Sequence, residues 1–200
     1  MNNRPLLRAC TFCAIVAFLA CTLVGCSTQL ALNSPKPTAP PMAAAQKESL
    51  TVVRFTDARK TKNLLTMVGA IGFGTPKLTK PNAAGDWVAM ALASDLEHAG
   101  AHVAVVTNAS TAQTPVVVTG RVSKIFTHIY SPAMFLRCDV DFSVVVHRNG
   151  MVVLQKNYQG VASSAYFGGP GAAQDIDAAM TKALKRALLL ATPEVIRASQ

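Results

Sequence analysis

A ten-residue alternation of apolar and polar side chains, from Cys138 to His147, constrains the fold of this chain most strongly. Successive side chains of a strand point to opposite faces of its sheet, so the pattern predicts a strand with one buried and one solvated face. The dipeptide Asn149-Gly150 follows and indicates a hairpin to an antiparallel partner strand. A two-residue and a three-residue loop give different registers. The three-residue loop, which pairs Val146 with Val152, is favoured because it buries the apolar residues of both strands together.

The other elements are expected from residue type and spacing. β-branched runs predict strands over 50–56, 102–107, 116–130 and 151–161, and apolar stripes predict helices over 87–99 and 174–191. Asp86 should cap the first helix and Gly100 should end it, while Pro193 should end or kink the second. The fold class that follows is α+β. We expect a two-layer sandwich, a mostly antiparallel sheet of about five strands with two helices on one face, in the order β-α-β-β-β-β-α.

The first 25 residues have the organisation of an export signal. Arg4 and Arg8 precede an almost entirely apolar stretch, which is shorter than the ~20 residues that a membrane-spanning helix needs. Residues 26–48 are rich in proline and alanine and are expected to form a flexible tether. We therefore expect one domain over 49–193, followed by a short tail over 194–200.

Net charge and cysteine content narrow the class of protein. The formal charge of +9 becomes +7 without Arg4 and Arg8. A basic protein meets nucleic acid, anionic lipid or acidic polymers, and export argues against nucleic acid. Alternatively, the basic residues only form a solvated surface and bind no particular partner. Four of the five cysteines lie at or before Cys26, so Cys138 has no partner for a disulfide within the domain.

A long stretch over 57–85 is interrupted by glycines and prolines and is expected to be a loop. Its apolar centre is flanked by cations, which suits contact with a lipid or a partner protein. A flap folded over the domain, or a short extra hairpin, would explain the same pattern. The candidate partner-binding residues are Arg59, Lys60, Lys62, Ile71, Phe73 and Lys77.

A search for catalytic or metal-binding residues yields one weak candidate. Asp139 and Asp141 share a strand face and could act with His128 or His147 in a hydrolase, but a solvated strand face is the commoner explanation for such a pair. Convergence of these side chains in a concave pocket would distinguish the two. No metal or cofactor is expected, and Cys138 is predicted to be a buried, inert thiol.

The tetrapeptide Leu23-Val24-Gly25-Cys26 resembles the lipobox of bacterial lipoproteins. The resemblance implies that the signal is cut before Cys26 and that this cysteine carries fatty acyl chains such as palmitate, which anchor the chain to a membrane. Ser27, where sorting signals for inner-membrane retention carry aspartate, favours the outer membrane. The domain would then face the periplasm.

The domain also resembles the YajG-type family of small bacterial lipoproteins. The matching pieces are Asp57-Ala58-Arg59, the glycines of 69–74, the helix end at Gly100, Lys156-Asn157-Tyr158 and the closing helix. The resemblance implies a non-catalytic lipoprotein of the outer membrane, acting as a periplasmic binding or assembly module, and carries over no catalytic residue. An auxiliary lipoprotein of an envelope lipid-transport complex is the alternative, and a secreted hydrolase using Asp139 and Asp141 is less favoured.

Overall fold

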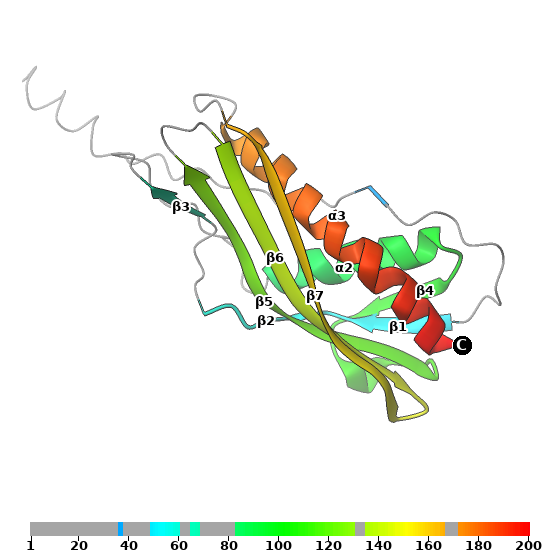
Figure 1. Cartoon of the computed structure of the whole chain (residues 1–200). Helices are drawn as coiled ribbons and strands as arrows, with labels where there is room; N and C mark the ends of the chain where they lie inside the picture. Colours follow the sequence, from blue (N-terminus) through cyan, green and yellow to red (C-terminus); the bar gives the residue numbers. More distant parts are fainter. Residues whose placement is uncertain (1–35, 38–48, 61–64, 69–82, 131–134, 167–171) are drawn as a thin grey trace, which may run out of the picture.

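The computed structural model describes residues 36–37, 49–60, 65–68, 83–130, 135–166 and 172–200. A mixed sheet forms one layer and two helices cover one of its faces (Figure 1). The predicted α+β sandwich is thereby confirmed. The strands are β1 (Ser49–Val53), β2 (Thr56–Asp57), β3 (Leu65–Val68), β4 (His102–Val106), β5 (Val116–Tyr130), β6 (Phe135–Arg148) and β7 (Met151–Ala165), and the helices are α2 (Ala83–His98) and α3 (Ala172–Ser199).

The strand order is β4-β1-β5-β6-β7, and the long strand β5 organises the sheet. On one side it pairs in parallel with three short strands in succession: β1 at Val116–Val118, β2 at Arg121–Val122 and β3 at 127–130. On its other side it pairs antiparallel with β6, which pairs antiparallel with β7. The sheet is therefore parallel in one half and antiparallel in the other. It is more parallel than the mostly antiparallel sheet that we predicted, because the short strands β1, β2, β3 and β4 all pair in parallel.

The region expected to be one strand and one long loop is more regular than the sequence indicated. The strand predicted over 50–56 is divided into β1 and β2, because the segment from Val52 to Thr56 is one residue longer than the segment of β5 that it faces, from Val118 to Arg121. Phe55 is buried at this interruption. Part of the loop predicted over 57–85 is strand β3, and the glycines and prolines that indicated a loop all follow this strand. Helix α2 begins at Ala83, so Asp86 lies in its first turn, where a carboxylate is favourable, rather than at its cap.

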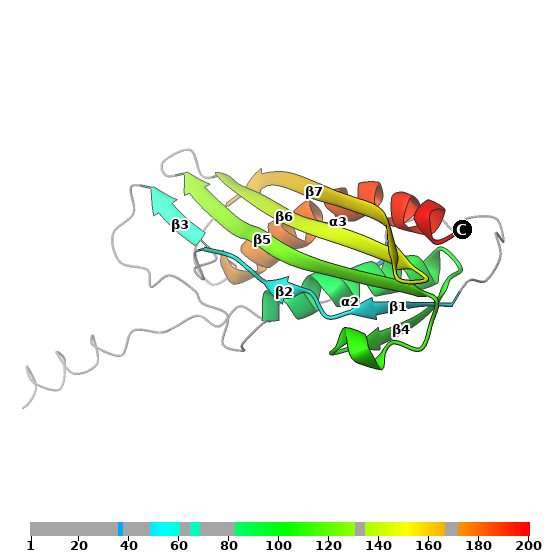
Figure 2. The ribbon, with the colours of Figure 1, turned by 90° about the horizontal axis from the view of Figure 1, so that it is seen from below.

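Both helices pack their predicted apolar stripes on the sheet. Val88, Leu92 and Leu96 of α2 are fully buried, and Gly100 ends this helix with a φ of 102° as expected. Helix α3 lies against β6 and β7 (Figure 2). It comes so close to β7 that the backbone of Ala183 occupies the place where a side chain on residue 160 would be, which only glycine permits.

Helix α3 does not end at Pro193. It continues to Ser199, and Val195, Ile196 and Ser199 are buried. The expected tail over 194–200 is therefore the end of a helix that packs one face on the core, while Arg197 is exposed. A proline in a helix removes the hydrogen bond to the carbonyl four residues earlier. Here that carbonyl belongs to Leu189, whose side chain is half exposed, so it lies on the solvent side of the helix. Among the described residues, no helix is both long and apolar enough to cross a membrane.

The β6–β7 hairpin has a two-residue loop and not the three-residue loop that we favoured. Asn149 and Gly150 both have positive φ, at 51° and 82°, and Arg148 pairs with Met151. One extra residue, Val153, then forms a β-bulge, so that Val146 pairs with Leu154. The bulge restores the burial of Tyr158 opposite Phe142. The predicted partners are therefore wrong by two residues. The predicted faces are right from Leu154 onward but wrong for Val152, which pairs with His147 and is exposed.

Candidate functional site

The helix-free face of the sheet carries most of the charged side chains of β5 and β6. Alternation along both strands, shifted by one bulge in β5, places Arg121, Lys124, Asp139 and Asp141 on this face, opposite the buried Val122 and Val140. The register of β5 against β6 shifts between Val122 and Lys124, which is the mark of a β-bulge at Ser123. Bulges of this kind redirect side chains. Ser123 and Lys124 are thereby both excluded from the core.

Asp139 is at the centre of a three-residue ion cluster. Its carboxylate accepts hydrogen bonds from Lys124 Nζ at 2.9 Å and from Arg137 Nε at 3.2 Å. Burial alone would raise the pKa of Asp139, but the hydrogen bonds and charges of these two cations outweigh it and lower the pKa. The sequence predicted a solvated side chain here. Asp139 is instead 5% exposed, because the two longer side chains cover it.

Arg59 is likewise less exposed than predicted. Its guanidinium makes a bidentate ion pair with Asp57, with Nε to Oδ1 and Nη2 to Oδ2 both at 2.9 Å. The side chain of Arg59 is 2% exposed, and its third nitrogen, Nη1, has no hydrogen-bond partner among the described residues. Such a nitrogen is costly to leave unpaired. Arg59 is therefore a fixed, buried cation and not a surface group.

An open hollow of about 440 Å³ joins these features. Its cations come from two directions, Arg59 and Lys60 from the segment after β2, and Arg121 and Lys124 from β5. Asp141 is its one acid, and burial raises the pKa of this carboxyl more than Lys124 lowers it. The lining residues are Ala58, Arg59, Lys60, Arg121, Ser123, Lys124, Ile125, Phe126 and Asp141. This hollow therefore combines four positive side chains with one carboxyl group, that of Asp141, whose charged form is disfavoured by burial.

A second hollow, of about 560 Å³, adjoins the first and shares Arg121, Ser123 and Asp141 with it. It extends across β6 to the amides of Asn157 and Gln159 on β7. Together the two hollows form a groove across three strands of the helix-free face, which we call the cationic groove. Its walls include hydrogen-bond donors from Arg121 and Lys124 at one side and from Asn157 and Gln159 at the other.

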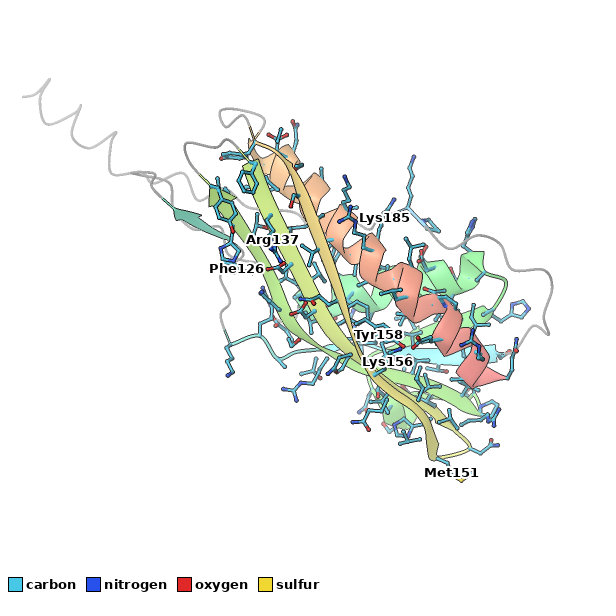
Figure 3. The ribbon with its side chains drawn as sticks, viewed as in Figure 1. Phe126, Arg137, Met151, Lys156, Tyr158 and Lys185 are labelled. Carbon is cyan, nitrogen blue, oxygen red and sulfur yellow. The ribbon has the colours of Figure 1, made fainter. Side chains whose placement is uncertain are left out.

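An aromatic strip begins at one end of the cationic groove and follows β5 to the start of β6. The rings of Phe126 and His128 meet edge to face at 4.6 Å, and those of Tyr130 and Phe135 stack at 4.5 Å and 10°. Figure 3 shows Phe126 near Arg137, which belongs to the ion cluster around Asp139. Aromatic faces next to cations are typical of sites that contact amphipathic groups.

The predicted partner-binding residues are recovered in part. Arg59 and Lys60 line the cationic groove, whereas Lys62, Ile71, Phe73 and Lys77 lie outside the described residues, as does Cys26. The sequence reasoning missed Arg121 and Lys124. Arg121 precedes the apolar Val122 in the strand predicted over 116–130, and alternation could have placed it on the solvated face. The same alternation places Lys124, three residues further on, on the opposite face, and only the bulge at Ser123 brings it beside Arg121.

The residues of the hydrolase hypothesis do not converge. His147 is six residues from Asp141 on the same strand, which is about 20 Å. His128 pairs with Arg137 and packs on Phe126, and no histidine lines either hollow. Asp139 is already paired with two cations. No three histidine, cysteine or acidic side chains among the described residues are placed to hold a metal.

Cys138 lies in the core, as predicted. It is fully buried on the helix-covered face of the sheet, and burial raises the pKa of its thiol to about 12. A thiol with such a pKa carries almost no thiolate at neutral pH and is a poor nucleophile. The prediction of a buried thiol is confirmed.

Comparisons with known proteins show the fold. No protein-family model and no curated protein matches the chain. A Xanthomonas campestris protein of the family model DUF330 has a similar structure, with a TM-score of 0.60 and 14% identity over 85% of this chain and 97% of that one. A PelC dodecamer from Paraburkholderia phytofirmans has a TM-score of 0.42 and 18% identity, over 76% of this chain and 92% of that one. Lipoprotein GNA1162 from Neisseria meningitidis has a TM-score of 0.38 and 14% identity, over 64% of this chain and 90% of that one.

Of these three structures, the Xanthomonas protein alone has a TM-score above 0.5. At 14% identity it shows a shared fold and nothing about function. The relation to the YajG-type family remains a prediction from the sequence.

Proposed function

We propose that this chain is a lipid-anchored protein of the bacterial outer membrane whose periplasmic domain binds an anionic partner group in the cationic groove. The anchor is inferred from the lipobox-like Leu23-Val24-Gly25-Cys26 and the apolar segment before it. Ser27 supports the outer membrane over the inner one. The role is that of a binding or assembly module and involves no catalytic step.

The composition of the cationic groove carries this proposal. Lys60 and Arg121 line one hollow together with Lys124, which also pairs with Asp139, and with the buried Arg59, which Asp57 holds in place. Arginine and lysine in this arrangement recognise carboxylate or phosphate groups through charge-assisted hydrogen bonds. A partner protein with acidic side chains fits this chemistry and also the adjoining aromatic strip.

Crosslinking in intact cells tests the proposal. A photo-reactive amino acid at Ser123, inside the groove, should crosslink to a partner, while the same group at Met90 on helix α2 should not. Replacing Lys60 and Arg121 together by glutamine, which leaves the Lys124–Asp139 ion pair intact, should lower the Ser123 yield by about fivefold, since each exposed ion pair contributes on the order of 0.5 kcal/mol. The matched control replaces Lys182 and Lys185 of α3 by glutamine.

Equal yields in the groove variant and the α3 variant would contradict a charge-based site. The identity of the crosslinked molecule separates this proposal from the alternative of a lipid-transport complex, which predicts a component of a transporter at the same position.

A further inference from the structure

The hairpin between β6 and β7 ends in three consecutive exposed apolar side chains. Met151, Val152 and Val153 are 69%, 54% and 39% exposed. Figure 3 shows Met151 at the far end of the hairpin, beyond the rest of the sheet. Single exposed apolar residues are normal in proteins, but three in succession at a projecting tip indicate a contact surface. We call these three residues the hairpin tip.

The chain enters the domain beside this tip. Leu50 of β1 pairs with Val116 of β5, and Val116 pairs with Arg148 of β6. At the same end, the Asn149 amide donates a hydrogen bond to the Pro115 carbonyl at 2.8 Å. The start of β1 is therefore two strand spacings, roughly 10 Å, from the hairpin turn. Figures 1 and 2 both place β1 and this turn at the same end of the sheet.

The charges at this end also suit a membrane surface. The hairpin residues 145–156 include Arg148, His147 and Lys156 and contain no aspartate or glutamate. The segment 112–118, which lies next to the turn, contains no acidic residue either. Basic residues beside apolar ones favour a bilayer with anionic headgroups. Lys156 is paired with Glu194, so Arg148 is the main positive charge near the tip.

We infer that the hairpin tip inserts into the interfacial region of the same bilayer that holds the acyl chains of Cys26. The inference rests on the proposed lipid anchor. The acyl chains hold the domain at the membrane, and the tip fixes its orientation, so that the sheet stands on its hairpin end. The start of β1 and the hairpin tip then lie at the same, membrane-facing end of the domain.

Lipid-quenched fluorescence of the lipidated full-length protein tests this orientation. An environment-sensitive fluorophore is attached to Val152→Cys in vesicles of phosphatidylethanolamine and phosphatidylglycerol. Ser163→Cys, exposed towards the opposite end of β7, is the matched control. The native Cys138 is fully buried and stays unlabelled, which the parent protein verifies. Brominated lipids should quench the fluorophore at 152 at least threefold more than at 163, and Met151→Asp should abolish the difference.

Flotation of the vesicles separates the two proposals. Protein that floats while position 152 is quenched no more than position 163 would overturn the membrane contact and leave the lipid anchor standing. Protein that does not float would overturn the anchor and this inference together. A blue shift at 152 that grows with protein concentration, without lipid quenching, would show that a second copy covers the tip, and would also overturn the inference.

Discussion

Asp139 and Asp141 lie two residues apart on one face of β6, yet their surroundings act on them in opposite ways. Lys124 and Arg137 bind Asp139 and lower the pKa of its carboxyl, whereas burial raises the pKa of Asp141. A lowered pKa stabilises the fold above the unfolded value of 3.8, and this stabilisation is lost as the pH falls through the lower folded value. A raised pKa has the reverse sign, so charged Asp141 destabilises the fold at neutral pH.

Isosteric amides should therefore change stability in opposite directions. At pH 7, Asp139→Asn should lower the free energy of unfolding by about 2 kcal/mol, because charge-assisted hydrogen bonds are lost. Asp141→Asn should leave it unchanged or raise it. The Asp141 difference should shrink as the pH falls through its raised folded pKa towards 3.8, and the Asp139 difference should shrink only below 3.8, as the pH falls towards its lowered folded pKa. Urea unfolding of the three proteins between pH 3 and pH 7 measures this. A loss of equal size in both variants would contradict the electrostatic description.

Gly160 gives a second prediction at the scale of one residue. A methyl group at this position would overlap the backbone oxygen of Ala183 in α3. Gly160→Ala should cost about 3 kcal/mol, because neither the helix nor the strand can move away without disturbing the core. Ser163→Ala, exposed on the same strand, is the control and should change stability by less than about 0.5 kcal/mol. Thermal unfolding compares them, and equal melting temperatures would contradict the close approach of α3 to β7.

At the scale of elements, the last turns of α3 are part of the core although they follow a proline. Val195→Ala should lower the free energy of unfolding by about 2 kcal/mol, because the side chain is completely buried. Arg197→Ala, exposed in the same turns, should have almost no effect. Denaturant unfolding of the two variants checks this. If Val195→Ala were as stable as Arg197→Ala, residues 194–199 would be the tail that the sequence suggested.

The elements also show how far sequence reasoning reaches. Strand β5 was predicted with its observed bounds, because alternation and the breaks at Pro115 and Ser131-Pro132 are local signals. The residue pairs of the β6–β7 hairpin were not predicted correctly, because the amino-acid composition does not indicate the bulge at Val153. Its register was predicted from the burial of apolar residues, and that argument fixes the face of a strand but not which residues pair.

The candidate site could be predicted only in part for a related reason. Arg59 and Lys60 were identified as cations near an apolar loop, and Arg121 and Lys124 stood in an expected strand. What brings them together is the parallel pairing of β2 with β5, in which Thr56 faces Arg121. Parallel pairs join segments far apart in the chain, so no local pattern announces them. The burial of Arg59 depends on the same pairing and its ion pair with Asp57.

At the scale of the whole molecule, the helix layer and the sheet layer have different roles. The helices cover one face of the sheet and stabilise it, and the other face is left for the cationic groove and the aromatic strip. In the proposed orientation the hairpin tip and the start of β1 point to the membrane. The groove, on the side of the sheet, then faces laterally into the periplasm, where a partner bound to the same membrane can reach it.

The central claim is that Cys26 becomes the acylated N-terminus of the mature protein, and intact-mass analysis of the protein extracted from its native membranes tests this most directly. The account predicts a chain that starts at Cys26 and carries fatty acyl chains, and a Cys26→Ala variant that remains an unprocessed, unacylated precursor. A mature chain that starts at another residue, or one that carries no acyl group, would contradict the account.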